Sequence, residues 1–462
     1  MSDRLATLNV TKNDEISRIV TSDDSYLAQL DAADDDEKFT LVRQWIDHEP
    51  LAFFQALRDH RPILVTPKAT LVARLDDCVE VLNQPKVFTV ALYEPKMDNY
   101  LMSHDDDAFH TREKSIMQGF LNRNDLPRVR TMVRETCIDL LSQAAGNMEL
   151  VGSYCRMVPA TLVQNYFGLT GVEREDLIEW SYWNQADTFY NQPFDNHTED
   201  QRNYIREQHE RTGTALAKYI TELMVRRVLA VKSEQATNII FALWYGLRKL
   251  VRHLMGEKPE VLNDDIVTRM IRSHFADTVE FDLQRVGVNA GGLLIGAIET
   301  TSQAVAQSVQ YMLDHPEWLA KAKSMATQTD TTAFDDIVWE TLRFVPISLY
   351  LFRQAATEAV IARGTDRETT IPAGAYVLAV TQSAMFDERA FDDPETFKPG
   401  RNWYHQFHFG YGEHQCLGRY VGAEMIPEMV RQVILLDGLQ AEGRIDYEGG
   451  HLPQKYQVAW SD

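Results

Sequence analysis

A short stretch near the C-terminal end of the chain, residues 407–418, combines residue types that could bind a metal. It reads Phe-His-Phe-Gly-Tyr-Gly-Glu-His-Gln-Cys-Leu-Gly, so glycines lie on both sides of one cysteine, Cys416. Glycine tolerates positive φ angles and lets the backbone approach a large planar group closely, while Phe409 can supply an apolar wall. The sequence after Gly418 favours a helix, whose N-terminal end would stabilise a thiolate. We therefore predict that Cys416 is the ligand of a buried metal.

Two interpretations of Cys416 follow from its residue type. A cysteine in a glycine-containing loop is most often a small buried hydrophobe. A thiolate also suits a haem iron, because it pushes electron density toward bound oxygen and favours O–O cleavage. The longer spacing Phe409-x-x-Gly412-x-His414-x-Cys416-x-Gly418 favours the second interpretation.

That spacing resembles the haem-binding signature of the cytochrome P450 superfamily, in which the arginine two residues before the cysteine is sometimes histidine, as at His414. The resemblance extends over about residues 50–460 and includes further motifs in the family's order. It implies that Cys416 ligates the iron of haem b, and that Phe409 and His414 contact this cofactor.

A second stretch that could do chemistry lies within residues 283–313, a long helical run that stops before Pro316. Its segment Gly296-Ala-Ile-Glu-Thr resembles the family's oxygen-binding motif. Splitting oxygen requires two protons in a pocket that otherwise excludes water. We therefore predict Glu299 as a proton relay and Thr300 as a hydroxyl that holds a water molecule. A seam of small residues for helix packing, with an incidental acid, is the alternative.

Glycines inside this helical run need a structural reason. Gly291, Gly292 and Gly296 each cost about 1 kcal/mol relative to alanine in a helix interior. We expect a close approach of another group, or a local opening of the helix, to offset that cost.

Three basic side chains are expected to bind the haem propionates. His110 and Lys114 lie four residues apart in a helical run and share one face. The resemblance implies a propionate role for both, although the family's second residue is usually arginine, and lysine keeps the charge without the bidentate geometry. Arg353, at the end of the strand-like segment 346–353, matches a further propionate-binding arginine. A solvated helix face of mixed charge is the alternative for residues 110–114.

Glu340 and Arg343 are three residues apart in a helical stretch, where a salt bridge can form. The resemblance implies that this pair is buried and that Arg401 completes a triad with it behind the haem. We expect these residues to support haem insertion and folding, with no part in the chemistry.

The whole chain is expected to have a mainly α fold with small β sheets. Residues 1–40 are predicted to be a partly ordered acidic tail that runs into a first helix, and residues 41–462 a single haem domain. Helices are predicted, among other places, at 129–141, 154–167, 173–190 and 201–231. Short strands are predicted at 62–67 and 70–75, and a turn followed by a strand at 371–380. The resemblance implies that 173–190 and 201–231 form the roof of a substrate pocket.

Four smaller expectations concern loops and helix ends. Residues 87–102 are predicted to be a loop over the pocket, and residues 449–453 a turn that reaches back toward it. Pro427 should kink or restart the helix that follows the cysteine. An apolar stripe with basic residues opposite it, within 233–263, predicts an amphipathic helix that faces the core or, alternatively, a membrane surface or partner.

Composition limits the partners of the protein. A net charge of −22 in 462 residues makes nucleic acid and anionic membranes poor partners. The four cysteines have no Cys-x-x-Cys spacing and indicate a reducing compartment, so a cytoplasmic protein is expected. No run of about 18 apolar residues occurs, and no transmembrane segment is predicted.

The resemblance implies a monooxygenase that inserts one atom of O2 into an apolar small organic substrate by hydroxylation, epoxidation or O-dealkylation. Electrons would come from NAD(P)H through a separate partner, a ferredoxin- or flavodoxin-type donor with its reductase, and Arg112, Lys114 and Arg419 are candidates for its docking surface. A peroxide-driven haem-thiolate peroxygenase and a non-enzymatic haem gas sensor are the alternatives.

Overall fold

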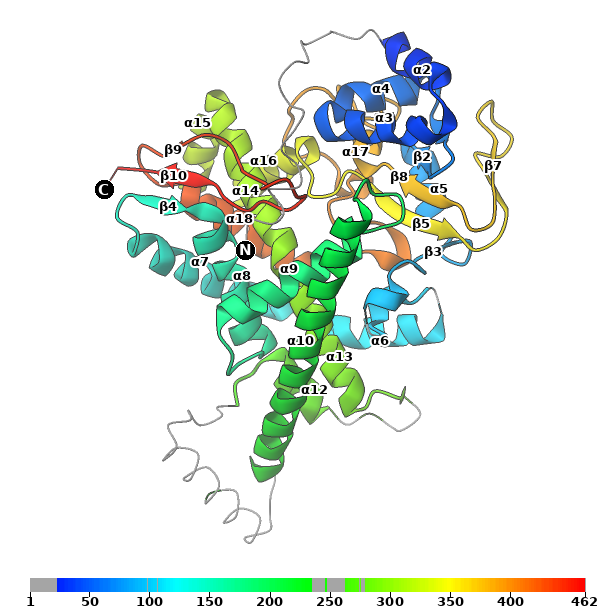
Figure 1. Ribbon diagram of the computed structural model, residues 1–462. Coiled ribbons are helices and arrows are strands. Elements are labelled where there is room, and N and C mark those ends of the chain that lie inside the picture. The colour runs from blue at the N-terminus through cyan, green and yellow to red at the C-terminus, as the bar shows by residue number, and fades with distance from the viewer. Residues whose placement is uncertain are drawn as a thin grey trace.

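The computed structural model describes residues 23–97, 99–105, 107–234, 246, 262–273, 275 and 279–461. They form a mainly helical molecule with small β sheets, which confirms the predicted fold class (Figure 1). The α-helices are α2 (Asp23–Ala32), α3 (Asp35–His48), α4 (Pro50–His60), α5 (Leu75–Leu82), α6 (Ala108–Phe120), α7 (Leu126–Ser142), α8 (Met157–Leu162), α9 (Arg174–Tyr190), α10 (Glu199–Glu234), α12 (Ile266–Arg272), α13 (Leu283–Ala297), α14 (Glu299–Asp314), α15 (Pro316–Ala326), α16 (Thr332–Phe344), α17 (Thr381–Ala384) and α18 (Arg419–Ile434).

The largest sheet has the strand order β1-β2-β8-β5-β3 and joins segments that are far apart in the sequence. In it β1 pairs antiparallel with β2, and β2 pairs parallel with β8. A second sheet has the order β4-β10-β9, and β6 pairs with β7 in a third. The strands are β1 (Ile63–Val65), β2 (Thr70–Val72), β3 (Phe88–Thr89), β4 (Asn147–Glu149), β5 (Leu351–Ala355), β6 (Ala359–Ile361), β7 (Thr369–Ile371), β8 (Tyr376–Ala379), β9 (Gln440–Ala441) and β10 (Gln457–Ala459).

The N-terminal region differs from the expected acidic tail. Residues 23–48 form α2 and α3, whereas residues 1–22 lie outside the described part of the chain. Tyr26, Leu30 and Phe39 are buried and belong to one apolar cluster with Phe352 of the largest sheet. Figure 1 shows α2, α3 and α4 grouped beside that sheet. The acidic residues that suggested a tail instead form the first turn of α3, where carboxylates interact favourably with the helix dipole. They are Asp35, Asp36 and Glu37.

The boundary predicted at residue 41 falls inside α3. That the remainder of the chain forms a single haem domain stays a prediction. The amphipathic stripe expected within 233–263 lies outside the described residues.

Two predicted elements change their bounds for local reasons. The strand expected from residue 346 begins only at Leu351. Pro346 lacks an N–H, and the hydroxyl of Ser348 donates to the carbonyl of Tyr350 at 2.6 Å, so the chain turns before the strand starts. The helix after the cysteine does not restart at Pro427, because α18 continues through it. Proline removes only its own N–H, and the buried residues around it hold the helix in place: Met425, Ile426, Met429 and Val430.

The helical run predicted at 283–313 is divided into α13 and α14. Ile298 lies between the two helices, with φ −87° and ψ −64°. This interruption is the local opening expected from the glycines, and α9 and α10 pack against α13 beside it.

Candidate active site

In the loop before α18, two glycines adopt positive φ angles. Gly410 has φ 72° and Gly412 has φ 68°, and a Cβ atom on Gly412 would lie 2.8 Å from the carbonyl oxygen of Leu82. This turn lets the N–H of Cys416 donate to the carbonyl of Phe409 at 2.8 Å. The sequence prediction that backbone freedom matters here is therefore confirmed at two of the three glycines.

Phe409 is fixed by aromatic and glycine neighbours. Its ring centroid lies 5.4 Å from that of Trp339, and a Cβ on Gly422 would lie only 3.0 Å from the ring. Trp403, which is partly exposed, also stacks on Phe409, with centroids 6.3 Å apart. The apolar wall predicted from Phe409 is thus a packed aromatic cluster directly before the cysteine.

Cys416 is a free cysteine whose side chain opens into a polar pocket shared with Lys114, Gln118 and Arg419. The surrounding protein raises the pKa of the Cys416 thiol, whereas the N–H of Gly418 and the charges of Lys114 and Arg419 act in the opposite direction. These donors favour a thiolate once a metal takes the place of the proton.

His110 and Lys114 lie on one face of α6 and both reach the cysteine loop. The ammonium of Lys114 donates to the carbonyl of Glu413, and Nε2 of His110 lies 3.3 Å from the same oxygen. The other ring nitrogen of His110 bonds to the carbonyl of Leu101 at 2.7 Å. Both side chains are buried, so the alternative of a solvated helix face is wrong.

Among the described residues, Arg353 has no carboxylate partner, and the ring nitrogens of His414 have no hydrogen-bond partner. Arg353 is buried at 3% exposure, and its guanidinium donates to the carbonyl of Phe352 at 2.8 Å. Among the described residues no carboxylate lies within ion-pair distance of it. Both ring nitrogens of His414 are buried without a partner. Burial and the charges of Arg353, His110 and Lys114 lower the pKa of His414 to about 2.

This electrostatic coupling indicates that His414 and the three residues predicted to bind propionates surround one place beside the cysteine loop. A buried guanidinium without a carboxylate, together with a histidine whose ring nitrogens have no partner, is an incomplete site for a protein alone. An anionic group such as a propionate would satisfy both. The residues present therefore fit a haem held by Cys416.

At the interruption between α13 and α14, side chains replace the missing helical contacts. The hydroxyl of Thr300 donates to the carbonyl of Gly296 at 2.9 Å. A Cβ atom on Gly296 would meet nothing within 4 Å, so this face of the helix borders open space. Thr300 is partly exposed to that space, as its predicted role requires.

Glu299 is buried at 1% exposure and forms an ion pair that the sequence did not predict. Its Oε2 accepts from Nε of Arg156 at 3.1 Å and from Nη2 at 2.9 Å, while its Oε1 is buried without a partner. The same Nη2 also donates to the carbonyl of Pro453 at 3.0 Å. Burial raises the pKa of Glu299, and Arg156 counteracts this effect.

Tyr100 is a further residue of the site that the sequence did not single out. A Cβ atom on Gly292 would lie 2.2 Å from Cε2 of Tyr100, so this ring packs directly on the α13 backbone. Burial and the negative charges of Cys416 and Glu113 raise the pKa of Tyr100. The phenol therefore lies between α13 and the cysteine loop. In the sequence, Gly292 indicated that another group approaches the helix closely, but it did not identify Tyr100 as that group.

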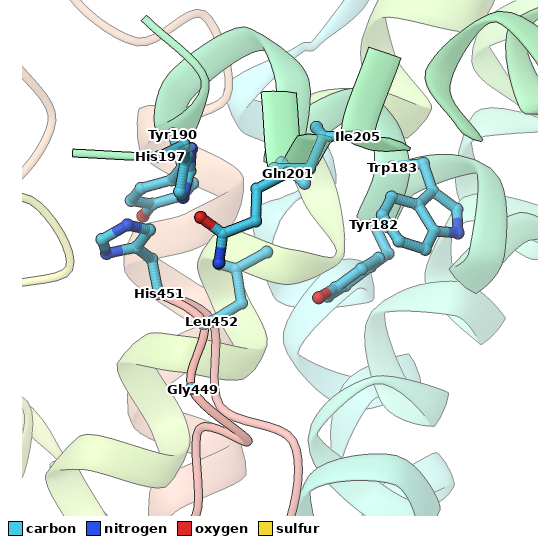
Figure 2. A pocket seen from close by; sticks show the side chains of 11 residues that line it. Tyr182, Trp183, Tyr190, His197, Gln201, Ile205, Gly449, His451 and Leu452 are labelled. Carbon is cyan, nitrogen blue, oxygen red and sulfur yellow. The ribbon is translucent and has the colours of Figure 1, made fainter. Parts of the chain in front are cut away.

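A second pocket lies between α9, the start of α10 and the C-terminal turn (Figure 2). The rings of Tyr190 and His451 stack with centroids 5.1 Å apart at 12°, and His197 lies against His451 at 5.6 Å. Figure 2 shows Tyr182 and Trp183 across the pocket from these rings. Residues 449–452 of the predicted turn therefore line this pocket together with α9 and α10.

Comparison with known proteins identifies the family. A model of the cytochrome P450 family matches residues 63–435. The chain belongs to the cytochrome P450 family. This membership confirms the family suggested by the Cys416 spacing and implies a haem.

Named relatives support the enzyme class. The cyclomarin C epoxidase of Salinispora arenicola is 24% identical over 380 residues, which are 78% of this chain and 82% of that protein. The steroid C26-monooxygenase of Mycolicibacterium smegmatis is 21% identical over 338 residues, 72% of this chain and 71% of that protein. The nocardicin C N-oxygenase of Nocardia uniformis is 30% identical over 175 residues, and this match spans only 41% of its length. The predicted class, an oxidoreductase of the monooxygenase type, is thereby confirmed.

Solved structures confirm the fold. A cytochrome P450 from Chondromyces apiculatus superposes with a TM-score of 0.67 at 18% identity, over 90% of this chain and 96% of that one. The P450 haem domain of Tepidiphilus thermophilus gives 0.68 at 19% identity, over 90% and 95%. In the part of the chain that the structure describes, no helix has the length and apolar character needed to span a bilayer.

Proposed function

We propose that the chain is a haem-thiolate monooxygenase that inserts one atom of O2 into an apolar small organic molecule by hydroxylation, epoxidation or O-dealkylation. The loop of Cys416 carries this proposal, because its sulfur opens into a pocket beside Lys114 and Arg419 and receives the N–H of Gly418. Cys416 would ligate the iron of haem b, and a thiolate-ligated haem supplies the activation of oxygen.

The residues that would hold the haem are His110, Lys114, Arg353, His414 and Phe409. The first four would bind the propionates through charge-assisted hydrogen bonds, and this would give Arg353 the anion that it lacks among the described carboxylates. Phe409 would supply an apolar contact next to the ligand.

Glu299 and Thr300 would supply protons to the reacting oxygen. Oε1 of Glu299 has no partner, whereas Arg156 holds Oε2, so one oxygen of this acid is available to accept and release a proton. The raised pKa of Glu299 brings the acid nearer to neutral pH and makes it a better proton donor there. Thr300 would hold a water molecule through the hydroxyl that now bonds to Gly296.

The pocket between α9, α10 and residues 449–452 supports an apolar substrate. Its walls are mainly aromatic and aliphatic side chains, with a few polar side chains among them, as is typical of pockets for small molecules. We propose that substrate reaches the haem past the lining residues Tyr182, Trp183, Tyr190, Ile205 and Leu452.

Electrons would come from NAD(P)H through a separate ferredoxin- or flavodoxin-type donor with its reductase. Of the three basic residues expected to dock this donor, Lys114 is buried and Arg112 pairs with Glu280 at 3.1 Å. Arg419 is a better candidate, because it donates to the hydroxyl of Tyr420 at 2.6 Å, and Arg123 donates to the same hydroxyl. Two guanidinium groups that donate to one phenol form a local positive charge on a chain of net charge −22. This local charge favours an acidic partner here.

Reversing the charge of Arg123 and Arg419 to Glu should slow reduction by the donor and weaken its dependence on salt. Reduction by dithionite serves as the control and should not change. Equal donor-supported rates in the variant and the wild type would exclude this docking surface.

The proposed function is tested on the purified holoprotein. After reduction and exposure to carbon monoxide, the wild type should show the red-shifted absorption of a thiolate-bound ferrous haem, and Cys416→Ser should lose it. An unshifted band in the wild type, or an unchanged band in the variant, would reject the assignment.

Two rival functions give different results with Thr300→Ala. A peroxide-driven enzyme should keep its peroxide-supported turnover, because it does not need proton delivery by Glu299 and Thr300. The monooxygenase should consume NAD(P)H without forming product. A gas sensor would show neither a substrate-induced change of spin state nor turnover.

We also propose that the protein works in the cytoplasm. Cys78, Cys137, Cys155 and Cys416 are all unpaired, and free cysteines of this kind suit a reducing compartment.

A further inference from the structure

We infer that Gln185, on the roof helix α9, is a positioning residue that keeps the α13–α14 helix interrupted. Its Nε2 donates to the carbonyl of Ile295 at 2.7 Å. In an uninterrupted helix this carbonyl would accept from the N–H of Glu299, four residues later. Here Ile298 lies outside both helices, and the first backbone bond of the new ladder runs from Ser302 to Ile298 at 2.9 Å.

The side chain of Gln185 competes with the helix for this acceptor. Gln185 is buried at 3% exposure and Ile295 at 9%, so water has little access to the carbonyl. A buried carbonyl needs a donor, and it can take one from the roof or from the backbone of its own helix. Because Gln185 supplies the donor, the backbone N–H of Glu299 is released from it.

Other roof side chains contact the same helix on both sides of the interruption. The hydroxyl of Ser181 lies 3.5 Å from the carbonyl of Ile295, and the hydroxyl of Tyr190 donates to Oε1 of Gln303 at 3.4 Å. Tyr182, on the same α9, lies under Arg156, whose guanidinium carbon is 5.4 Å from the ring centroid. Helix α9 therefore contacts this segment on both sides of the acid and the alcohol, at Ile295 and at Gln303.

The consequence for function rests on the proposed monooxygenase. Tyr182 and Tyr190 line the pocket through which substrate would pass, and Gln185 lies on the same helix. A substrate that shifts α9 would weaken or strengthen the Gln185 bond and so change the opening beside Glu299 and Thr300. In this way the site would sense a bound substrate before protons are delivered.

The test replaces Gln185 by Met, which keeps the length of the side chain and removes its donor. Hydrogen exchange of the backbone amide of Glu299 is the first readout. If the carbonyl of Ile295 returns to its own helix, this amide gains a hydrogen bond, and its exchange should slow about fivefold to tenfold. Gln185→Glu, which also loses the donor when it is ionised, should give the same direction of change.

Asn184→Leu is the matched control. Asn184 is also buried on α9, but its side-chain amide donates to Trp180 of the same helix at 2.9 Å. This variant should leave the exchange of the Glu299 amide unchanged. The second readout is the fraction of NAD(P)H that yields product, which should fall in Gln185→Met and not in Asn184→Leu.

Unchanged or faster exchange at Glu299 in Gln185→Met, or an equal effect in Asn184→Leu, would overturn the inference. Should the variants not fold, hydrogen exchange of the wild type tests the inference. The released amide of Glu299 must then exchange at least about tenfold faster than the amide of Val305, which lies inside α14. The exchange result does not depend on turnover. A failed carbon monoxide test would therefore reject the proposed function and leave this inference intact.

Discussion

Replacing Arg156 by Met should expose the cost of burying the acid Glu299 of α14. Arg156 makes two hydrogen bonds to one oxygen of Glu299, and the side chains are only 10% and 1% exposed. Removing one partner of such a buried pair leaves an uncompensated charge and typically costs about 3–5 kcal/mol. The same substitution also removes the bond to the carbonyl of Pro453. Arg156→Met should therefore lose at least about 3 kcal/mol of unfolding free energy when Glu299 is ionised.

The loss should depend on pH in a defined direction. In the wild type burial raises the pKa of Glu299 above its ordinary value of 4.5, and Arg156 lowers it. Without Arg156 the folded-state pKa must rise further. A carboxyl with a raised folded-state pKa destabilises the fold as pH increases from the unfolded value through the folded value. The difference between variant and wild type should thus be small near pH 4.5, grow as pH rises, and become constant above the folded-state pKa of the variant.

Urea denaturation followed by circular dichroism, at pH 5 and pH 8, measures both effects. The double variant Arg156→Met with Glu299→Gln removes the charge together with its partner. It should recover about 2 kcal/mol or more relative to Arg156→Met at pH 8 and should have a weaker pH dependence. An Arg156→Met protein as stable as the wild type at pH 8, or a double variant less stable than the single one, would refute the reasoning.

Three further predictions follow from packing and charge. Gly292→Ala should lose about 1–3 kcal/mol of unfolding free energy, because its Cβ would lie 2.2 Å from the Tyr100 ring, and adding Tyr100→Ala should restore part of it in the same denaturation assay. Arg353→Met should weaken haem binding about tenfold to a hundredfold in a haem titration, and leave the haem-free form at least as stable as the wild type, since it removes a buried charge without a carboxylate partner. Arg343→Met should lose about 3–5 kcal/mol, because it leaves Glu340 buried without the bonds of 2.7 and 3.0 Å that it now receives, and Glu340→Gln should recover part of this loss.

The parts of the site that could be predicted from the sequence depend on residues close together in the chain. The Cys416 loop needs glycines at fixed offsets, and Glu340 and Arg343 need only one helical turn to meet. In the structure this pair is buried and bonded, and Nε of Arg401 joins it at 3.2 Å from Glu340. The triad expected from the resemblance is therefore present, because its first two members are positioned by α16 alone.

The contacts that escaped prediction join segments far apart in the chain. Neither Arg156 nor Gln185 belongs to a recognisable sequence motif, and their partners on α14 and α13 are more than one hundred residues away. The extent of the N-terminal helices was underestimated for another reason. A run of acids such as Asp34 to Glu37 suits both a solvated tail and the first turn of a helix, and only the packing of Phe39 distinguishes them.

The bond from Arg156 to Pro453 has a consequence for the biosynthesis of the enzyme. Pro453 precedes β10, which pairs with β4 near residue 148, so β10 completes a sheet begun some three hundred residues earlier in the chain. Until that strand is released, Arg156 lacks one of its acceptors. The contacts of Arg156 can thus be completed only after residue 453 has left the ribosome, and a nascent chain stalled before that residue would hold Glu299 and Arg156 without the carbonyl of Pro453.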